Sequence, residues 1–379
     1  MGLFYKRRSS MPAGLIGFLF VFISSIGLWF NEGRSVNQSD ALHEMQAEIQ
    51  TLPDTKYHPD FQNKPVLVQG KMSATATVID PEFKISTKGL VLKRTVEMYQ
   101  WEEITQSEPR NETSYHYKKK WLAEPMDSSS FKESETHYNP PFPYPNESFS
   151  NTIMIGDYRL SKEVLDKIEI SRNLSLSSFP NKINDAINHK SFLFIGKDIN
   201  LPSIGDVKIS YQYAPQGDYS IAAKLENKSL FNYTSSNKKS LSFVRNGIVS
   251  ATRIFDDEQA NNTSLTWTFR VFGLIVMFLS FWAVLRTFTA FLDYIPVVGP
   301  LLNGVSSVVA GVLTLIFGSL VISLAWFSAR PLLAVSILTI GGIIAFLLGK
   351  FGKKRKNLKA QQRASTSTPP PRKTPPPRT

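Results

Sequence analysis

Residues 305–327 read VSSVVAGVLTLIFGSLVISLAWF and contain no charged side chain. As an α-helix with a rise of 1.5 Å per residue, this stretch crosses a hydrocarbon core about 30 Å thick. A helix of this length in a water-soluble protein would show a polar stripe, and this one shows none. The stretch therefore predicts a membrane-spanning helix.

Small residues recur in this helix at intervals of three and four, which places them on one helix face. The set is Gly304, Ser307, Gly311, Thr314 and Gly318. Small residues allow close helix approach in lipid, although glycine is also frequent in membrane helices generally. We predict that this seam packs against the last hydrophobic run of the chain. The alternative partner is the same seam of a second chain. The residues predicted to face the seam within the chain are Gly341, Ala345 and Gly349.

Four hydrophobic runs divide the chain into seven segments. They are a basic start at 1–11, a first span at 12–30, a polar domain at 31–267, spans at 268–289, 301–327 and 331–349, and a tail at 350–379. The first run resembles a signal peptide because basic residues precede it. It is long, however, and no small-x-small cleavage site follows it. We therefore predict a retained signal-anchor helix.

The net charge of +12 is concentrated at the two ends of the chain. Basic residues flank spans on the cytosolic side of membranes, so both termini are predicted to be cytosolic and the polar domain lies on the other side. The same placement argues against nucleic-acid binding, which favours charge spread over one face. The basic residues predicted to contact anionic headgroups are Arg34, Arg330, Lys350, Lys353, Lys354, Arg355 and Lys356.

The polar domain reads as an extracytoplasmic α+β domain. Hydrophobic periodicity predicts helices at 39–52, 160–170, 180–189 and 247–259. Strands are predicted at 66–78, 83–101 and 114–121, with further strands at 192–196, 207–213 and 219–225.

The most distinctive stretch of this domain is LVLKRTVEMYQWEE at 90–103. As a strand, it places alternate side chains on opposite faces. One interpretation is a partner-binding or self-association surface; the other, which we favour, is a structural strand with cross-strand charge pairs. The candidate interaction residues are Arg94, Glu97, Met98, Tyr99, Gln100 and Trp101.

Three stretches together resemble one family. They are Asn31-Glu32-Gly33-Arg34, the 90–103 strand, and the region from Thr266 that contains TWTFRVFGLIVMF, DYIPVVGP and LAWFSARPL. The chain is similar to the LUMA family of four-span membrane proteins, found in animal endoplasmic reticulum and inner nuclear membrane and also in bacteria. The resemblance implies the same topology and self-association. In animals it also implies nuclear-envelope organisation with lamins and emerin, and it implies no catalytic activity.

The residues themselves give no sign of catalysis. The chain has no cysteine, and its five histidines are scattered without a metal-ligand spacing. Neither a nucleophile elbow nor a phosphate-binding loop motif occurs. We expect no cofactor, no metal and no nucleic acid.

The predicted function is a non-enzymatic, self-associating multi-pass membrane scaffold that organises membrane-protein complexes. The predicted partners are anionic lipids, copies of itself and other membrane proteins. The alternative is a channel or transporter subunit, for which the spans offer only serine, threonine and Asn303 as polar residues. A membrane-bound hydrolase ranks third. The predicted location is the endoplasmic reticulum or inner nuclear membrane in a eukaryote, and the cytoplasmic membrane in a bacterium.

Overall fold

The computed structural model describes residues 10–107, 113–292, 298–330, 335 and 339. The chain divides into two compact units. The described parts of Met1–Ser39 and Asn261–Thr379 form a helical unit, and Asp40–Ala260 forms a β-rich unit.

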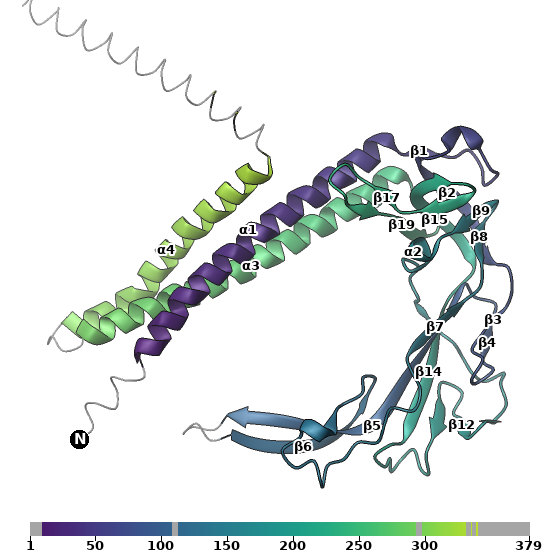
Figure 1. Ribbon diagram of the computed structural model, residues 1–379, viewed down its shortest axis with the longest axis horizontal. Coiled ribbons are helices and arrows are strands. Elements are labelled where there is room, and N and C mark those ends of the chain that lie inside the picture. Colours follow the sequence, from purple (N-terminus) through teal and green to yellow (C-terminus); the bar gives the residue numbers. More distant parts are fainter. Residues whose placement is uncertain (1–9, 108–112, 293–297, 331–334, 336–338, 340–379) are drawn as a thin grey trace, which may run out of the picture. The chain divides into compact units, whose positions relative to one another are not determined.

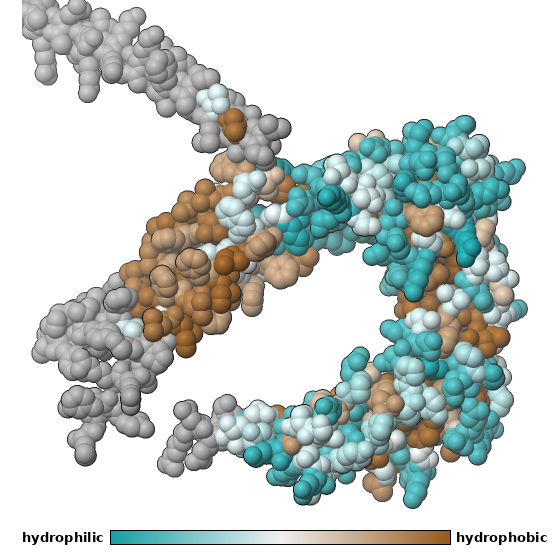
Figure 2. Space-filling view, in the orientation of Figure 1, coloured by the Kyte–Doolittle hydropathy of each residue, from teal (hydrophilic) through white to brown (hydrophobic). Residues whose placement is uncertain are grey.

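Three long helices build the helical unit: α1 (Ser10–Glu48), α3 (Ala251–Leu292) and α4 (Val298–Ala329) (Figure 1). Among the described residues, three stretches are long and apolar enough to cross a membrane, namely Gly14–Glu48, Ala251–Thr287 and Ser306–Ala329. The surface of this unit is mostly apolar (Figure 2). The fourth predicted span, 331–349, falls almost wholly outside the described residues.

The helices are longer than their apolar runs. The α1 helix continues through Gly33 to Glu48, so residues 39–48 of the helix predicted at 39–52 are its continuation, and Gln50–Thr51 form a strand instead. Likewise, α3 begins at Ala251 and includes residues 251–259 of the helix predicted at 247–259 together with the second predicted span. The reason is that the ends of both helices, 40–48 of α1 and 251–260 of α3, belong to the β-rich unit and pack within its core. Leu42 and Met45 of α1 and Phe255 of α3 are buried in one apolar cluster with strand residues of that unit.

Glycines bring the helices of the helical unit into close contact. A Cβ atom added at Gly273 of α3 would lie 2.7 Å from the Leu28 side chain of α1, and one at Gly318 of α4 would lie 2.3 Å from Leu274 of α3. At both positions a larger side chain would have to displace the neighbouring leucine or the helix that carries it.

The seam that α4 buries is rotated from the predicted one. Its fully buried members are Ser306, Ala310, Thr314, Gly318 and Ala325. Thr314 and Gly318 were predicted. Gly318 faces Leu274 of α3, and the predicted partner, the last hydrophobic run, lies almost wholly outside the described residues. The predicted Ser307 is exposed, and no atom of the described residues lies within 4 Å of a Cβ added at Gly311. The side-chain surroundings of Gly304, and Gly341, Ala345 and Gly349 altogether, lie outside the described residues.

The β-rich unit contains two main sheets. Sheet 1 has the order β1 (Gln50–Thr51), β2 (Pro65–Ala74), β8 (Ile153–Ile155), β9 (Tyr158–Leu160), β16 (Ser229–Phe231), β15 (Gly217–Glu226) and β19 (Phe243–Asn246). Because β2 also pairs with β15, its inner strands close into a ring around an apolar core.

Sheet 2 has the order β11 (Lys182–Ile183), β12 (Ala186–Asn188), β13 (Leu193–Ile195), β14 (Val207–Ala214), β5 (Val91–Ser107) and β6 (Thr113–Leu122). In addition, β10 (Arg172–Asn173) pairs with β14, and β7 (Glu147–Ser150) pairs with β5. Two small hairpins are formed by β3 (Val78–Ile79) with β4 (Ser86–Thr87) and by β17 (Tyr233–Thr234) with β18 (Ser240–Leu241).

Two helices predicted within this unit are wrong. The helix predicted at 160–170 is reduced to the single turn α2 (Lys162–Leu165). The one predicted at 180–189 is the β11–β12 hairpin, whose turn residue Asn184 has a φ of 52°. Asparagine tolerates this left-handed conformation, and the turn aligns Ile183 and Ala186 with the core of sheet 2. The domain is therefore β-rich.

Candidate functional site

A cluster of polar residues joins α1 to α3 in the helical unit. On α1, Asn31, Glu32, Arg34 and Ser35 lie within one helical turn. On α3, Asn262, Thr266 and Arg270 are spaced by four and therefore form a single stripe. We call these seven residues the interhelical polar network.

Arg34 lies at the centre of the network. Its Nη1 donates to Oδ1 of Asn262 at 3.1 Å, and its Nη2 donates to Oδ1 of Asn31 at 3.2 Å and to Oγ1 of Thr266 at 3.0 Å. The Asn31 amide donates in turn to the Thr266 carbonyl at 3.1 Å. The Asn262 amide donates to the Ser35 carbonyl at 2.9 Å. Because each side chain bridges both helices, a shift of one helix along the other breaks several hydrogen bonds at once.

A buried ion pair extends the network toward the apolar part of the helices. Arg270 donates from Nε and Nη2 to the two carboxylate oxygens of Glu32, each at 2.7 Å. Glu32 is only 1% exposed, whereas the Arg270 side chain is 22% exposed and its guanidinium lies 4.9 Å from the Trp267 ring centroid. A buried pair adds little net stability over apolar residues, but loss of one partner is costly. Such a pair therefore selects one helix register.

These contacts correct two predictions. The first helix does not end with the predicted span at residue 30, since α1 continues to Glu48. Arg34 directs both terminal nitrogens to protein acceptors rather than to a lipid headgroup, and Glu32 pairs with Arg270. Arg330 lies 5.6 Å from the Trp326 ring centroid, and its headgroup contact stays a prediction. Lys350, Lys353, Lys354, Arg355 and Lys356 lie outside the described residues.

The second candidate region is strand β5, where the predicted alternation is present. Arg94, Met98 and Gln100 are 3%, 1% and 0% exposed, while Tyr99 and Trp101 on the opposite face are half-buried, as is Glu97. The three buried residues are therefore not available to a partner. A predicted cross-strand charge pair is present between Glu102 of β5 and Lys120 of β6, at 2.5 Å.

Arg94 is held in a buried charge cluster. Its Nη1 lies 2.9 and 2.8 Å from the two oxygens of Asp80, and its Nη2 lies 3.1 Å from Glu147. The Tyr211 hydroxyl donates to Asp80 at 2.7 Å. Burial, together with the hydrogen bond to this carboxylate, raises the pKa of Tyr211 well above its usual range. Arg94 and Asp80 are buried and compensate each other, while the Glu147 side chain is 50% exposed. The cluster therefore joins β5 to β7 and to the segment around Asp80.

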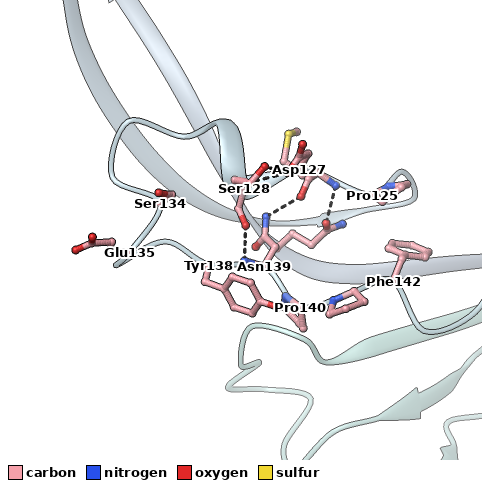
Figure 3. A pocket seen from close by; sticks show the side chains of 13 residues that line it. Pro125, Asp127, Ser128, Ser134, Glu135, Tyr138, Asn139, Pro140 and Phe142 are labelled. Atoms are coloured by element: carbon pink, nitrogen blue, oxygen red, sulfur yellow. Dashed lines mark hydrogen bonds between the residues drawn. The ribbon is translucent and has the colours of Figure 1, made fainter.

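A cavity of about 590 Å³ lies beside β5, beneath the 125–142 loop (Figure 3). Its buried polar side chains are used to hold the loop. Gln100 accepts from the Met126 backbone N–H at 2.9 Å, and Asn139 bonds to both the N–H and the carbonyl of Trp101. Ser128 accepts from the Asn139 N–H at 2.9 Å. Among the described residues, no group of three histidines or acids lies close enough to hold a metal ion.

The comparisons with known proteins identify the family. The family model for transmembrane protein 43 matches residues 98–331, from the middle of β5 to the end of α4. The chain belongs to the transmembrane protein 43 family. Mouse and human transmembrane protein 43 are each 28% identical to it over 361 residues, which is 88% of this chain and 89% of each relative. The transmembrane protein 43 homolog of Drosophila melanogaster is 25% identical over 355 residues, 88% of this chain and 93% of the fly protein. No solved structure matches the chain.

Membership of the transmembrane protein 43 family agrees with the resemblance to the LUMA family and makes this chain a membrane protein. The family match includes the α3 half of the interhelical polar network. That half was missed by sequence reasoning, although its spacing of Asn262, Thr266 and Arg270 on a helix leading into an apolar run was a usable signal. Asn262 is 7% exposed and its amide is engaged in the network.

Proposed function

We propose that this transmembrane protein 43 family member is a non-enzymatic, self-associating membrane scaffold. The observation that supports it most is the interhelical polar network, in which buried polar groups fasten two helices that lie more than 200 residues apart in the chain. The residues of the network bond to one another rather than to an open site. This arrangement suits a membrane anchor in which α1 and α3 keep one register and the β-rich unit is presented to partners.

The proposed topology has four spans, with both termini in the cytosol. The fourth span is the run at 331–349, and the basic residues that follow it should lie on anionic headgroups. In a eukaryote the protein would reside in the endoplasmic reticulum or inner nuclear membrane, and in a bacterium in the cytoplasmic membrane. Protease added to sealed vesicles with the cytosolic face outward should trim only the tail. Digestion of 40–260 without detergent would refute the topology.

The described helices offer little support for the channel alternative. Ser24, Ser280 and Thr314 are buried, and each hydroxyl donates to a carbonyl of its own helix, at 3.0, 2.6 and 2.8 Å. Hydroxyls used in this way are unavailable to replace the hydration shell of a moving ion. Conductance of the purified chain in vesicles separates the two functions, because a scaffold carries no current.

Crosslinking of the chain in its native membrane tests the scaffold directly. We expect crosslinked species at multiples of the 42.6 kDa chain mass, together with co-purifying membrane proteins. A matched sample crosslinked after dissolution in excess detergent separates stable from diffusional contacts. A chain that stays monomeric and alone at every crosslinker concentration would contradict the proposal.

A further inference from the structure

The β5–β6 hairpin extends beyond the rest of sheet 2. The β14 strand pairs with β5 from Val91 to Met98, whereas β6 pairs with β5 from Met98 to Ser107. The distal hairpin, which we define as 99–107 and 113–121, is thus a two-stranded ribbon (Figure 1). A two-stranded ribbon is marginally stable in water unless something packs against it. The 125–142 loop covers its base, and its far end lies free among the described residues.

The outer edge of this ribbon is positively charged. The β6 sequence TSYHYKKKWL contains three consecutive lysines and no acid. Its neighbouring carboxylates on β5 are already engaged: Glu102 pairs with Lys120 at 2.5 Å, and Glu103 accepts from the Tyr117 hydroxyl at 2.7 Å. Lys118 and Lys119 are exposed and form no ion pair with the described residues. Lysines on an edge strand also prevent unwanted pairing with other strands. This protective role explains why β6 carries three lysines, but it does not explain the aromatic residues beside them.

An aromatic ring lies beneath one of these lysines, since the Lys119 ammonium is 4.7 Å from the Trp101 ring centroid. Trp121 of β6 in turn lies beneath a lysine of β14, with the Lys208 ammonium 4.0 Å from its ring centroid. Tyr115, farther along β6, is 37% exposed. Tryptophan, tyrosine and lysine together are the side chains that favour the boundary between water and a bilayer.

From this surface we propose that the outer edge of β6, formed by Tyr115, Lys118 and Lys119, docks on the anionic surface of the membrane that holds the chain's own helices. The proposal needs a membrane-embedded chain and anionic lipid in the leaflet that faces residues 40–260, and it is independent of scaffold activity. Tethering by α1 and α3 keeps the local concentration of that surface high.

The absence of cysteine from the chain makes a site-specific test simple. The full-length Tyr115→Cys chain is labelled with an environment-sensitive fluorophore and placed in vesicles of phosphatidylcholine alone or mixed with phosphatidylserine. A lipid carrying a quencher at headgroup depth should quench the label in the mixed vesicles, and added salt should reverse this. The control is Leu201→Cys, a site 78% exposed in another loop, whose label should stay unquenched.

Charge removal completes the test. Each lysine near an anionic surface strengthens binding about fivefold, so Lys118→Gln with Lys119→Gln should lower the docked-to-undocked ratio about 25-fold. Both side chains are exposed, and the thermal unfolding midpoint should not change. The matched control, Lys162→Gln in α2 with Lys167→Gln in the turn that follows it, removes two exposed lysines elsewhere and should leave quenching intact. Equal quenching of the two labels, or quenching that survives loss of both β6 lysines, overturns the proposal. So does a Tyr115 label that is never quenched, the result expected if an acidic partner protein occupies the edge instead.

Discussion

Substitution of the two partners of the Glu32–Arg270 ion pair should have unequal costs. With Arg270→Met, a carboxylate that is 1% exposed is left without its donor, and about 3–5 kcal/mol of stability should be lost. In Glu32→Gln, the remaining guanidinium is already 22% exposed and can turn toward headgroups. The glutamine also retains a hydrogen bond, so the loss should be about 1–2 kcal/mol.

Reversible unfolding of the full chain in mixed detergent micelles measures both values. The double variant should lose less than the sum of the two single losses, because no unpaired charge remains. Arg253→Met is the control. Its guanidinium pairs with Asp257 on α3 but its side chain is 71% exposed, so the expected loss is below about 1 kcal/mol. Equal losses for the two single variants, or strict additivity in the double variant, would show that water reaches the pair and that it does not set the helix register.

Three further predictions follow from packing, protonation and charge. Gly318→Leu should cost about 1–3 kcal/mol by forcing α4 away from Leu274, whereas Gly311→Leu should leave the α3–α4 contact intact; equal thermal shifts would contradict this. Tyr211→Phe should cost about 1–3 kcal/mol at neutral pH because a buried carboxylate loses a donor. The folded state raises the pKa of Tyr211, so the stability that its protonated hydroxyl contributes persists below pH of about 10 and is lost as the pH rises above it. The Tyr211→Phe variant should therefore show a smaller alkaline decline in unfolding free energy. A peptide of residues 350–379 should bind phosphatidylserine vesicles in a salt-sensitive way, and equal binding to neutral vesicles would count against headgroup contact.

The sequence predicted features that depend on local patterns. Three of the apolar runs correspond to helices able to span a membrane. The alternation in 90–103 predicted β5 and its buried face, because a strand with one buried face must repeat every two residues. The neighbours of that strand were not predictable, since the charges around Arg94 come from Asp80 and Glu147, which lie 14 and 53 residues away.

Helix ends were poorly predicted because they, too, depend on contacts with residues that are distant in the sequence. Polar residues after Phe30 suggested that the first helix stops there, yet Asn31 and Glu32 continue it because α3 supplies their hydrogen bonds. The helix predicted at 180–189 had apolar residues at helical spacing. The left-handed turn at Asn184 and pairing with β13 favoured a hairpin instead. In both cases a distant contact outweighed local preference.

The separation of 238 residues between Glu32 and Arg270 has a consequence for biosynthesis. At typical synthesis rates of about 5–20 residues per second, Arg270 emerges roughly 12–48 s after Glu32. During that interval the glutamate carboxylate must remain hydrated, because no counter-charge exists to bring it into the helix interface. The first helix therefore waits at the membrane while the β-rich unit is synthesised, and the two helices can lock together only afterwards. Chains truncated before Arg270 should stay in this open state, which would make them preferred substrates for membrane quality-control proteases.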